Sequence, residues 1–433
     1  MNQRFDYLVI GNSAGGIGCV EMLRDLDPPG TISVISEEAH HVYSRALLPY
    51  YLGGRIDREK MYYRPPDFYE QMGVATFLGK RVLRVDFSEK EVELDTKEKI
   101  GYGKLLLATG GKPFIPSFEG LEKKNVFTFS TMEDALRIEK ALKNARRVVV
   151  LGGGVIGLMA AEVFRKRGLE AHVLELAERV LAPVVDEVAS EMVEAALREN
   201  SVEIHTKNTV RKITGGDFVE SVILTDGVEI PCDMLILSVG VVPRVELVEG
   251  TGINVNKGIM VNKRMQTSLP NVYACGDCAE AYDFVTGGER IVPLWPNAYV
   301  GGRIAACNMA GRERKYEWGT SMNSMHFFDL NIITAGLNVP HDRQSDFDVI
   351  DRLDRKNKAY RKFILQDGKL VGMILAGKIC RAGIFVNLMR SKVDVSCFGH
   401  ELLNGEFGYL SIPEELRWEL LKDDVILGVV GDQ

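Results

Sequence analysis

The chain has 433 residues, which is long for a single hydrophobic core and predicts two or three domains. An apolar content of 46% with 43 glycines is typical of an α/β enzyme that contains many tight turns. The net charge of −7 argues against a general nucleic-acid binder, and no apolar run approaches the roughly 18 residues that a membrane span needs. With no signal peptide apparent, we expect a cytoplasmic protein that binds neither membranes nor nucleic acid.

The N-terminal residues have the pattern of a dinucleotide-binding unit. An apolar strand at residues 7–10 leads into a glycine turn at 11–16 and an apolar-faced helix, and a second strand at 31–36 ends on two acids. Ser13 stands at the middle glycine position, where its side chain would crowd a pyrophosphate, so the pattern alone leaves a ligand-free turn equally open. The candidate contacts are Gly11, Ser13, Ala14, Gly16, Glu37 and Glu38.

A buried strand at residues 105–107 ends in a turn of small residues. This stretch and the later one at residues 271–277 favour a dinucleotide site at the N-terminal pattern more strongly than that pattern does alone. The candidate contacts in this turn are Ala108, Thr109 and Gly110.

A longer dinucleotide pattern occupies residues 148–175, where an apolar strand leads through three glycines into a helix and then a second strand. The first glycine permits a tight turn, the second lets backbone amides approach a pyrophosphate, and the third lets the helix pack on the strand. Glu175 would accept hydrogen bonds from the adenosine ribose and repel a 2′-phosphate, which favours NAD, although the nearby Arg179 leaves NADP open. The candidate NAD contacts are Gly152, Gly154, Val155, Ile156, Gly157 and Glu175.

Another short strand, at residues 271–275, delivers Gly276 and Asp277 on a turn. An aspartate in this position can bind the polyol chain of a flavin, and the simpler interpretation is an Asx-type turn. Cys275 and Cys278 flank the turn as the only C-x-x-C pair among seven cysteines. Without a second pair, ordinary buried thiols are favoured over a metal or redox pair, and we expect no metal site.

These four motifs, in this order, resemble those of the FAD-dependent pyridine nucleotide-disulfide oxidoreductase superfamily. The resemblance implies two doubly wound, Rossmann-like α/β domains and a small C-terminal α+β interface domain that ends in a helical extension. An FAD-binding domain would be split into residues 1–116 and 245–318, with an NAD-binding domain at 117–244 inserted in it and the C-terminal domain at 319–433. FAD and NAD(H) would be the cofactors.

The segment at residues 37–54 separates branches of this superfamily. Thiol-using members place a reactive cysteine near Ala46, but this chain has none between Cys19 and Cys232. Its aromatic-polar-arginine run at 43–45 is instead similar to rubredoxin reductases, ferredoxin reductases of oxygenase systems and the flavin portion of NADH-dependent nitrite reductases. The resemblance therefore implies no redox-active cysteine. It adds Arg45, Val82 and Trp295 to the flavin contacts and Gly240 to the NAD contacts. For Trp295, an interface or core position is the alternative.

Many relatives pair a lysine near the position of Tyr50 with a glutamate near that of Met159, and both partners are absent here. Glu162, one turn further along the same helix face, is either a replacement acid or a solvated helix residue. We favour the solvated residue.

Alternating segments after residue 319 predict antiparallel strands at 346–353, 360–366 and 370–376, with Asp367-Gly368 as a hairpin turn. Helices are predicted near 381–390 and 414–422. The last helix would cover the chain's own core or a neighbouring subunit. Six basic residues within 352–362 form either a solvated hairpin or a docking face for an acidic partner. They are Arg352, Arg355, Lys356, Lys358, Arg361 and Lys362.

The resemblance implies an enzyme that moves electrons between NAD(H) and an iron–sulfur protein, a rubredoxin or the iron–sulfur subunit of a larger complex, through FAD. Two other functions remain open. One is an NADH oxidase that acts directly on oxygen, and the other is a redox-sensing interaction protein similar to apoptosis-inducing factor.

Overall fold

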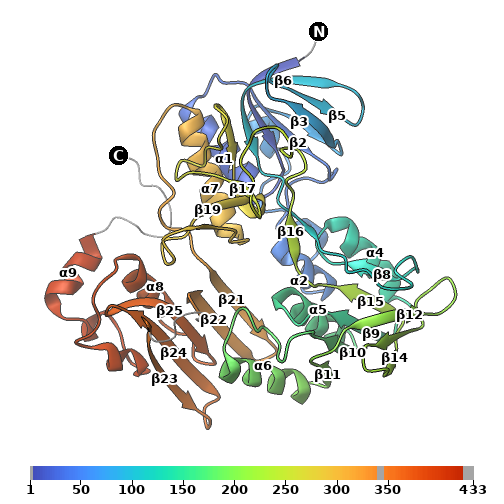
Figure 1. Cartoon of the computed structure of the whole chain (residues 1–433), viewed down its shortest axis with the longest axis vertical. Helices are drawn as coiled ribbons and strands as arrows, with labels where there is room; N and C mark the ends of the chain where they lie inside the picture. Colours follow the sequence, from blue (N-terminus) through green and yellow to red (C-terminus); the bar gives the residue numbers. More distant parts are fainter. Residues whose placement is uncertain (1–2, 339–345, 423–433) are drawn as a thin grey trace. The chain divides into compact units, whose positions relative to one another are not determined.

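The computed structural model describes residues 3–338 and 346–422, and the chain forms two compact units (Figure 1). One unit contains residues 1–113, 130–132 and 241–320, and the other contains 114–129, 133–240 and 321–433. The predicted fold class of two doubly wound α/β domains with a C-terminal α+β domain is confirmed, whereas the domain boundaries stay predictions. Within the described residues, no helix combines the length and the apolar character needed to cross a membrane.

The first unit is built on a seven-stranded sheet in the order β3-β2-β1-β6-β5-β4, with β18 paired to β6. The pairings among β3, β2, β1, β6 and β18 are parallel, and those of β5 are antiparallel. The middle strands are continuous apolar runs because both of their faces are buried. The strands are β1 (Gln3–Ile10), β2 (Ile32–Ser36), β3 (Val74–Leu78), β4 (Val82–Asp86), β5 (Glu91–Leu94), β6 (Lys99–Leu107) and β18 (Val272–Ala274).

Two helices from opposite ends of this unit's sequence, α1 (Ala14–Leu26) and α7 (Trp295–Met309), pack against each other (Figure 1). They approach closely because Gly302 of α7 faces the backbone of Gly15, and a Cβ at Gly302 would lie 1.9 Å from the Gly15 oxygen. The remaining elements are α2 (Leu48–Leu52), α3 (Phe68–Gln71), the pair β7 (Gly111–Pro113) and β16 (Val241–Pro243), and the small sheet of β17 (Ile259–Met260), β19 (Ala279–Tyr282) and β20 (Glu289–Arg290).

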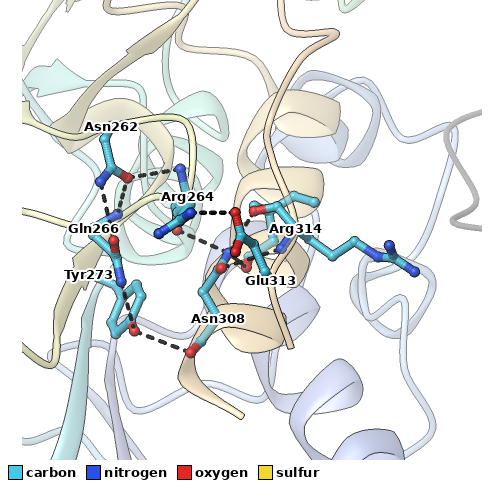
Figure 2. A network of polar contacts seen from close by, with 8 residues as sticks. Asn262, Arg264, Gln266, Tyr273, Asn308, Glu313 and Arg314 are labelled. Carbon is cyan, nitrogen blue, oxygen red and sulfur yellow. Dashed lines mark hydrogen bonds and ion pairs between the residues drawn. The ribbon is translucent and has the colours of Figure 1, made fainter. Parts of the chain in front are cut away.

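A network of polar contacts fixes the C-terminal end of α7 to the sheet, as Figure 2 shows. The Asn308 amide donates to the backbone oxygen of Arg314 at 2.8 Å and to that of Arg264 at 3.3 Å. The Tyr273 hydroxyl on β18 donates to the Asn308 backbone oxygen at 3.2 Å. Arg264 also forms an ion pair with Glu313. These contacts hold α7 in one position relative to β18.

The second unit contains a parallel five-stranded sheet in the order β11-β10-β9-β15-β8. Its strands are β8 (Val126–Thr128), β9 (Arg147–Leu151), β10 (Glu170–Leu174), β11 (Val202–His205) and β15 (Met234–Leu237). Its helices are α4 (Met132–Leu142), α5 (Val155–Lys166) and α6 (Glu187–Glu199), and an antiparallel meander follows with β12 (Val210–Thr214), β13 (Ser221–Leu224) and β14 (Glu229–Pro231). The alternation of strands and helices gives the doubly wound topology that the glycine pattern predicted.

The C-terminal part of this second unit is an antiparallel sheet in the order β21-β22-β25-β24-β23. Asp367 and Gly368 both have positive φ values, 49° and 72°, as a two-residue hairpin turn requires, so the predicted turn is confirmed. The elements are β21 (Met322–Phe327), β22 (Leu330–Gly336), β23 (Asp348–Asp354), β24 (Ala359–Gln366), β25 (Lys369–Ala376), α8 (Ala382–Arg390) and α9 (Glu414–Lys422). On α9, Leu420 is buried and Trp418 is exposed.

Candidate functional site

In the first unit, the carboxyl ends of four parallel strands meet at one edge of the sheet. The backbone N–H of Gly11, after β1, donates to the Ile35 oxygen of β2 at 2.9 Å. The N–H of Ala108, after β6, donates to the Ile10 oxygen at 2.8 Å, and the N–H of Cys275, after β18, donates to the Leu107 oxygen at 3.1 Å. The turns that follow these strands therefore lie side by side, at the edge where open α/β sheets bind ligands. This edge brings together the predicted turns at 11–16, 108–110 and 276–277.

The glycine turn after β1 has the steric features of a phosphate-binding turn. Gly11 has a φ of +126°, and a Cβ there would lie 2.1 Å from the Ala108 oxygen. A Cβ at Gly16 would lie 1.9 Å from the Gly11 oxygen. Ser13 is the N-cap of α1, but its side chain makes no capping hydrogen bond, so the first-turn amides have no partner from that side chain. Buried Ala14 begins the helix.

The two acids after β2 are already bound by cations. A guanidinium nitrogen of Arg244 lies 2.5 Å from Glu37. Glu38 accepts hydrogen bonds from the Tyr43 hydroxyl at 2.7 Å and from Arg45 at 2.6 Å. Ion pairs near the end of β2 therefore include three predicted residues, Glu37, Glu38 and Arg45. Arg45 pairs directly with Glu38.

Arg244 was not among the predicted residues, yet it joins two of the predicted segments. Its backbone N–H donates to the Gly110 oxygen at 2.9 Å, and its backbone oxygen accepts from the Thr109 hydroxyl at 2.8 Å. Its guanidinium pairs with Glu37, 207 residues away in sequence. The predicted domain boundary between residues 244 and 245 falls next to Arg244, but nothing local indicated its partners.

Asp277 places a partly buried carboxyl at the same edge. Burial raises the pKa of this carboxyl, and the charge of Arg45 opposes the rise. Gly276 before it has a φ of +76°, which directs the turn. A partly desolvated carboxylate in this position can accept hydrogen bonds from donors supplied by a ligand, such as the hydroxyl groups of a polyol chain.

The side chain of Trp295 is exposed, whereas that of Val82 is buried. Trp295 begins α7 and stacks on Tyr299 with ring centroids 5.5 Å apart and planes 7° apart, while Tyr63 meets its ring edge-on. Val82, the first residue of β4, is buried in the hydrophobic core of the unit. A contact between Val82 and a cofactor would therefore have to use the backbone.

The thiols at this edge are buried. Burial raises the pKa of the Cys275 thiol and of the Cys278 thiol. The Cys278 thiol donates to the backbone oxygen of Cys275 at 3.3 Å. Both cysteines are free and protonated, as expected for ordinary buried thiols.

In the second unit, the strand ends of β9, β10 and β15 form a similar edge. Gly152 has a φ of +117°, and a Cβ there would lie 2.2 Å from the Ser238 oxygen, while a Cβ at Gly157 would lie 2.0 Å from the Gly152 oxygen. A Cβ at Gly154 would meet no atom within 4 Å. Gly152 and Gly157 are thus required by the fold itself, whereas Gly154 leaves open space at the start of α5, where a ligand phosphate can approach.

Both oxygens of the Glu175 carboxylate are held by backbone amides. The Gly153 N–H donates to Oε2 at 2.7 Å and the Ala177 N–H donates to Oε1 at 2.8 Å. Each oxygen retains a lone pair for a further donor such as a ribose hydroxyl. Gly153 was not a predicted site residue, although it lies between two predicted glycines.

The other predicted residues of the second unit lie at the start of α5 and after β15. Val155 begins α5, Ile156 next to it has an exposed side chain, and Gly240 follows β15 with a φ of +103°. The guanidinium of Arg179 donates to the backbone oxygens of Ala182 at 3.4 Å and Val185 at 3.2 Å.

One expectation about charged residues was wrong. Glu162 is buried rather than solvated, and it forms an ion pair with Lys166, whose ammonium lies 5.1 Å from the ring centroid of Phe328. The basic run at 352–362 is mixed, because four of its six basic residues are exposed and Arg361 is buried. Three of its members bind within the fold: Arg361 is buried and donates to the Asn404 oxygen, Lys362 pairs with Asp186, and Lys358 pairs with Glu199.

Comparison with known protein families identifies two matching regions. Residues 5–302 match the model of the pyridine nucleotide-disulphide oxidoreductases. Residues 322–393 match the model of the rubredoxin NAD+ reductase C-terminal domain. The first match includes both glycine-rich turns and the Asp277 turn.

Several individual proteins are similar over almost their whole length. The NADH-dependent phenylglyoxylate dehydrogenase subunit epsilon of Aromatoleum evansii is 31% identical, over 90% of this chain and 92% of that protein. The NADH oxidase of Methanocaldococcus jannaschii is 31% identical, over 93% of this chain and 94% of that protein. The structure of a ferredoxin reductase from Rhodopseudomonas palustris has a TM-score of 0.80 and 29% identity, and covers 88% of this chain and 93% of that chain.

Proposed function

This chain belongs to the pyridine nucleotide-disulphide oxidoreductase family, and from that premise we propose that it transfers electrons between NAD(H) and an iron–sulfur or rubredoxin-type protein. It is an NAD(H)-dependent flavin oxidoreductase, and its cofactors are FAD and NAD(H). The proposed part is the electron-transfer partner, which is either a separate carrier protein or the iron–sulfur subunit of a larger complex.

When bound, FAD exchanges a hydride with the nicotinamide and exchanges single electrons with an iron centre. The residues of the first unit fit this cofactor. The amides at the start of α1, which Ser13 does not cap, would bind the pyrophosphate. The partly buried Asp277 would accept hydrogen bonds from the polyol chain, and the N-terminal end of α7 at Trp295 would stabilise negative charge on the flavin ring.

We propose NAD rather than NADP as the nicotinamide cofactor. Glu175 would accept hydrogen bonds from the ribose hydroxyls and repel a 2′-phosphate. Arg179, the nearby cation, already donates to the backbone oxygens of Ala182 and Val185. Binding a 2′-phosphate would require Arg179 to give up these contacts.

The observation that carries the iron–sulfur proposal is the state of the thiols beside Asp277. Cys275 and Cys278 are buried, and burial raises the pKa of both thiols, so neither is a reactive thiolate. The segment around Ala46 contains no cysteine. Electrons would therefore leave the flavin without a protein thiol, a route that suits a one-electron iron centre.

The similar proteins support two kinds of partner. The ferredoxin reductase from Rhodopseudomonas palustris supports a separate carrier protein. The Aromatoleum evansii relative is itself a subunit of an NADH-dependent dehydrogenase, which supports an assembly that oxidises an organic substrate. The NADH oxidase of Methanocaldococcus jannaschii supports direct reaction with oxygen as the second candidate function.

We also propose a cytoplasmic location and an oligomer that forms through the C-terminal domain. The exposed side chain of Val349 on β23, an edge strand of the C-terminal sheet, supports such a contact. All seven cysteines are free, which suits a reducing compartment. Light scattering of the purified protein would test the oligomeric state.

Anaerobic stopped-flow spectroscopy of the purified flavoprotein tests the proposed function. We expect NADH to bleach the bound FAD faster than NADPH does, and ferredoxin or rubredoxin to restore the oxidised spectrum. As a control, Cys278→Ala should retain this turnover, because the thiol carries no electrons in the proposal.

Other results of the same experiment would reject parts of the proposal. When oxygenated buffer is mixed with the reduced protein in place of a carrier protein, rapid reoxidation, with no reaction with the carrier proteins, would favour the NADH oxidase. A persistent charge-transfer complex with negligible turnover with every acceptor would favour a redox-sensing protein. Absence of bound FAD, or failure of NADH to bleach it, would overturn the central claim.

A further inference from the structure

Three potential metal ligands converge on two neighbouring strands of the second unit. Glu203 and His205 are two residues apart on β11, the edge strand of the five-stranded sheet, so their side chains share one face. His172 lies on β10 and pairs with Glu203 in the parallel register. The strand pairing therefore brings two imidazoles and a carboxylate together at the sheet edge.

The distances between these groups are close to those within a metal's coordination shell. His172 Nδ1 lies 3.2 Å from His205 Nε2 and 3.4 Å from Glu203 Oε2. Glu203 Oε2 lies 4.0 Å from His205 Nε2. Ligand atoms bound about 2.0–2.1 Å from a tetrahedral zinc ion lie about 3.3–3.4 Å from one another. The three atoms thus stand near three corners of such a tetrahedron.

A fourth residue, Glu170, orients the most buried of these ligands. Its Oε1 lies 3.2 Å from His172 Nε2, on the opposite side of the ring from the cluster. When Nε2–H donates to this carboxylate, Nδ1 keeps its lone pair and directs it towards Glu203 and His205. Metal-binding histidines commonly donate their second ring N–H to a carboxylate in this way.

In the tautomer that donates from Nε2 to Glu170, His172 Nδ1 presents a lone pair towards the cluster. This lone pair lies 3.2 Å from His205 Nε2 and 3.4 Å from Glu203 Oε2. A divalent cation bound to all three atoms would use these acceptors together.

We propose that His172, Glu203 and His205 form a binding site for a divalent transition metal, with Zn²⁺ as the ion that fits best. Two imidazoles and one carboxylate are a ligand set that zinc favours. Because the side chain of Glu203 is largely exposed, a water molecule can occupy the fourth position. The bound metal would fasten the edge strand β11 to β10, which is a structural role. This site departs from the expectation of no metal in the chain.

The competing arrangement uses a proton in place of the metal. His172 Nδ1 would then carry a proton and donate to Glu203 or to His205 without any metal. The two arrangements predict different behaviour towards zinc and cobalt, so they can be separated by experiment.

Isothermal titration calorimetry of the chelator-treated flavoprotein with ZnCl₂ tests the proposal. We expect one zinc ion per chain and a rise in the melting temperature of the holoprotein when zinc is added. With CoCl₂ in place of zinc, we expect visible absorption bands of tetrahedral cobalt at wavelengths longer than those absorbed by the flavin. His205→Asn should weaken zinc binding by at least about tenfold, and Glu170→Gln should weaken it by about 10–100-fold.

Matched controls separate this site from non-specific binding. His400→Asn and Glu187→Gln remove an exposed histidine and an exposed carboxylate from the second unit and should leave zinc binding unchanged. Glu203→Gln, on the exposed strand edge, provides a second ligand variant if His205→Asn folds poorly, and retained FAD with NADH bleaching would show that each variant is folded. Failure of the wild-type protein to bind zinc, or equal binding by the ligand variants, would overturn the proposal in favour of the metal-free hydrogen-bonded arrangement.

Discussion

At the scale of single residues, backbone amides of the second unit fix the orientation of the Glu175 carboxylate. The amides of Gly153 and Ala177 each donate to one of its oxygens, at 2.7 and 2.8 Å. These donors fix the carboxylate in one orientation. The remaining lone pairs are therefore pre-positioned at the end of β10, where we propose that the ribose of NAD binds.

Glu175→Gln should weaken NADH binding while leaving FAD bound. The substitution keeps the length and shape of the side chain, but it removes the negative charge and replaces one acceptor oxygen with a donor. A hydrogen bond to a charged group contributes about 1.5–3 kcal/mol, so we expect KM for NADH to rise by about 10–100-fold with little change in kcat. Steady-state kinetics with a saturating electron acceptor would measure both constants.

Glu178→Gln is the matched control for this prediction. Glu178 is exposed and pairs with Lys207, so its loss should leave KM for NADH unchanged. An equal rise in KM for both variants would mean that general negative charge, rather than the Glu175 carboxylate, determines the affinity.

At the scale of elements, the contact between α1 and α7 depends on glycine. The backbone of Gly15 approaches Gly302 so closely that a methyl group has no room between them. The N-terminal ends of both helices belong to the proposed flavin site, and the polar network around Asn308 holds the other end of α7. Displacing α7 should therefore affect both stability and FAD binding.

Gly302→Ala should destabilise the protein and reduce its FAD content. The added Cβ would lie 1.9 Å from the Gly15 oxygen, a backbone atom that can move only with its helix. We expect a loss of about 1–3 kcal/mol in the free energy of unfolding, as is typical of overpacking. Chemical denaturation and the ratio of flavin to protein absorbance would measure the two effects.

Gly383→Ala in α8 is the control, because a Cβ there meets no atom within 4 Å. This substitution should be neutral or stabilising by up to about 1 kcal/mol. If Gly302→Ala behaved in the same way, the close approach of α1 and α7 would not limit stability.

At the scale of the whole molecule, the carboxylate of Asp186 at the start of α6 connects the doubly wound part of the second unit to the C-terminal sheet. Asp186 is the N-cap of α6 and accepts from the Ala189 amide at 3.1 Å. It also accepts from the Tyr360 hydroxyl at 2.7 Å and from the Lys362 ammonium at 2.9 Å, both on β24. Burial, followed by the hydrogen bond to Asp186, raises the pKa of Tyr360, so the tyrosine stays a donor.

Lys362→Ala should destabilise the second unit more than Lys358→Ala does. The side chains of Lys362 and Asp186 are only 13% and 15% exposed, so removing the lysine leaves a poorly solvated carboxylate and should cost about 1–3 kcal/mol. Lys358 and Glu199 are 72% and 57% exposed, and this pair should contribute less than about 1 kcal/mol. Urea unfolding followed by circular dichroism would compare the two variants, and equal losses would contradict this difference.

The sequence alone was sufficient for the features that depend on local chemistry. Strand and helix positions followed from the apolar periodicity, and the turns at Gly11, Gly152 and Asp367-Gly368 followed from the positive φ that each requires. The ordered glycine motifs also indicated the cofactors, because a phosphate-binding turn is contained in a few consecutive residues.

Only the tertiary structure decided which charged residues form ion pairs. Arg244 pairs with Glu37 across 207 residues and Lys362 with Asp186 across 176, and no local pattern specifies such pairs. The burial of Glu162 also depends on how the faces of α5 are covered. In each case the partner is set by sheet order and helix packing, which bring distant residues together, whereas sequence periodicity reports only which face of an element is apolar.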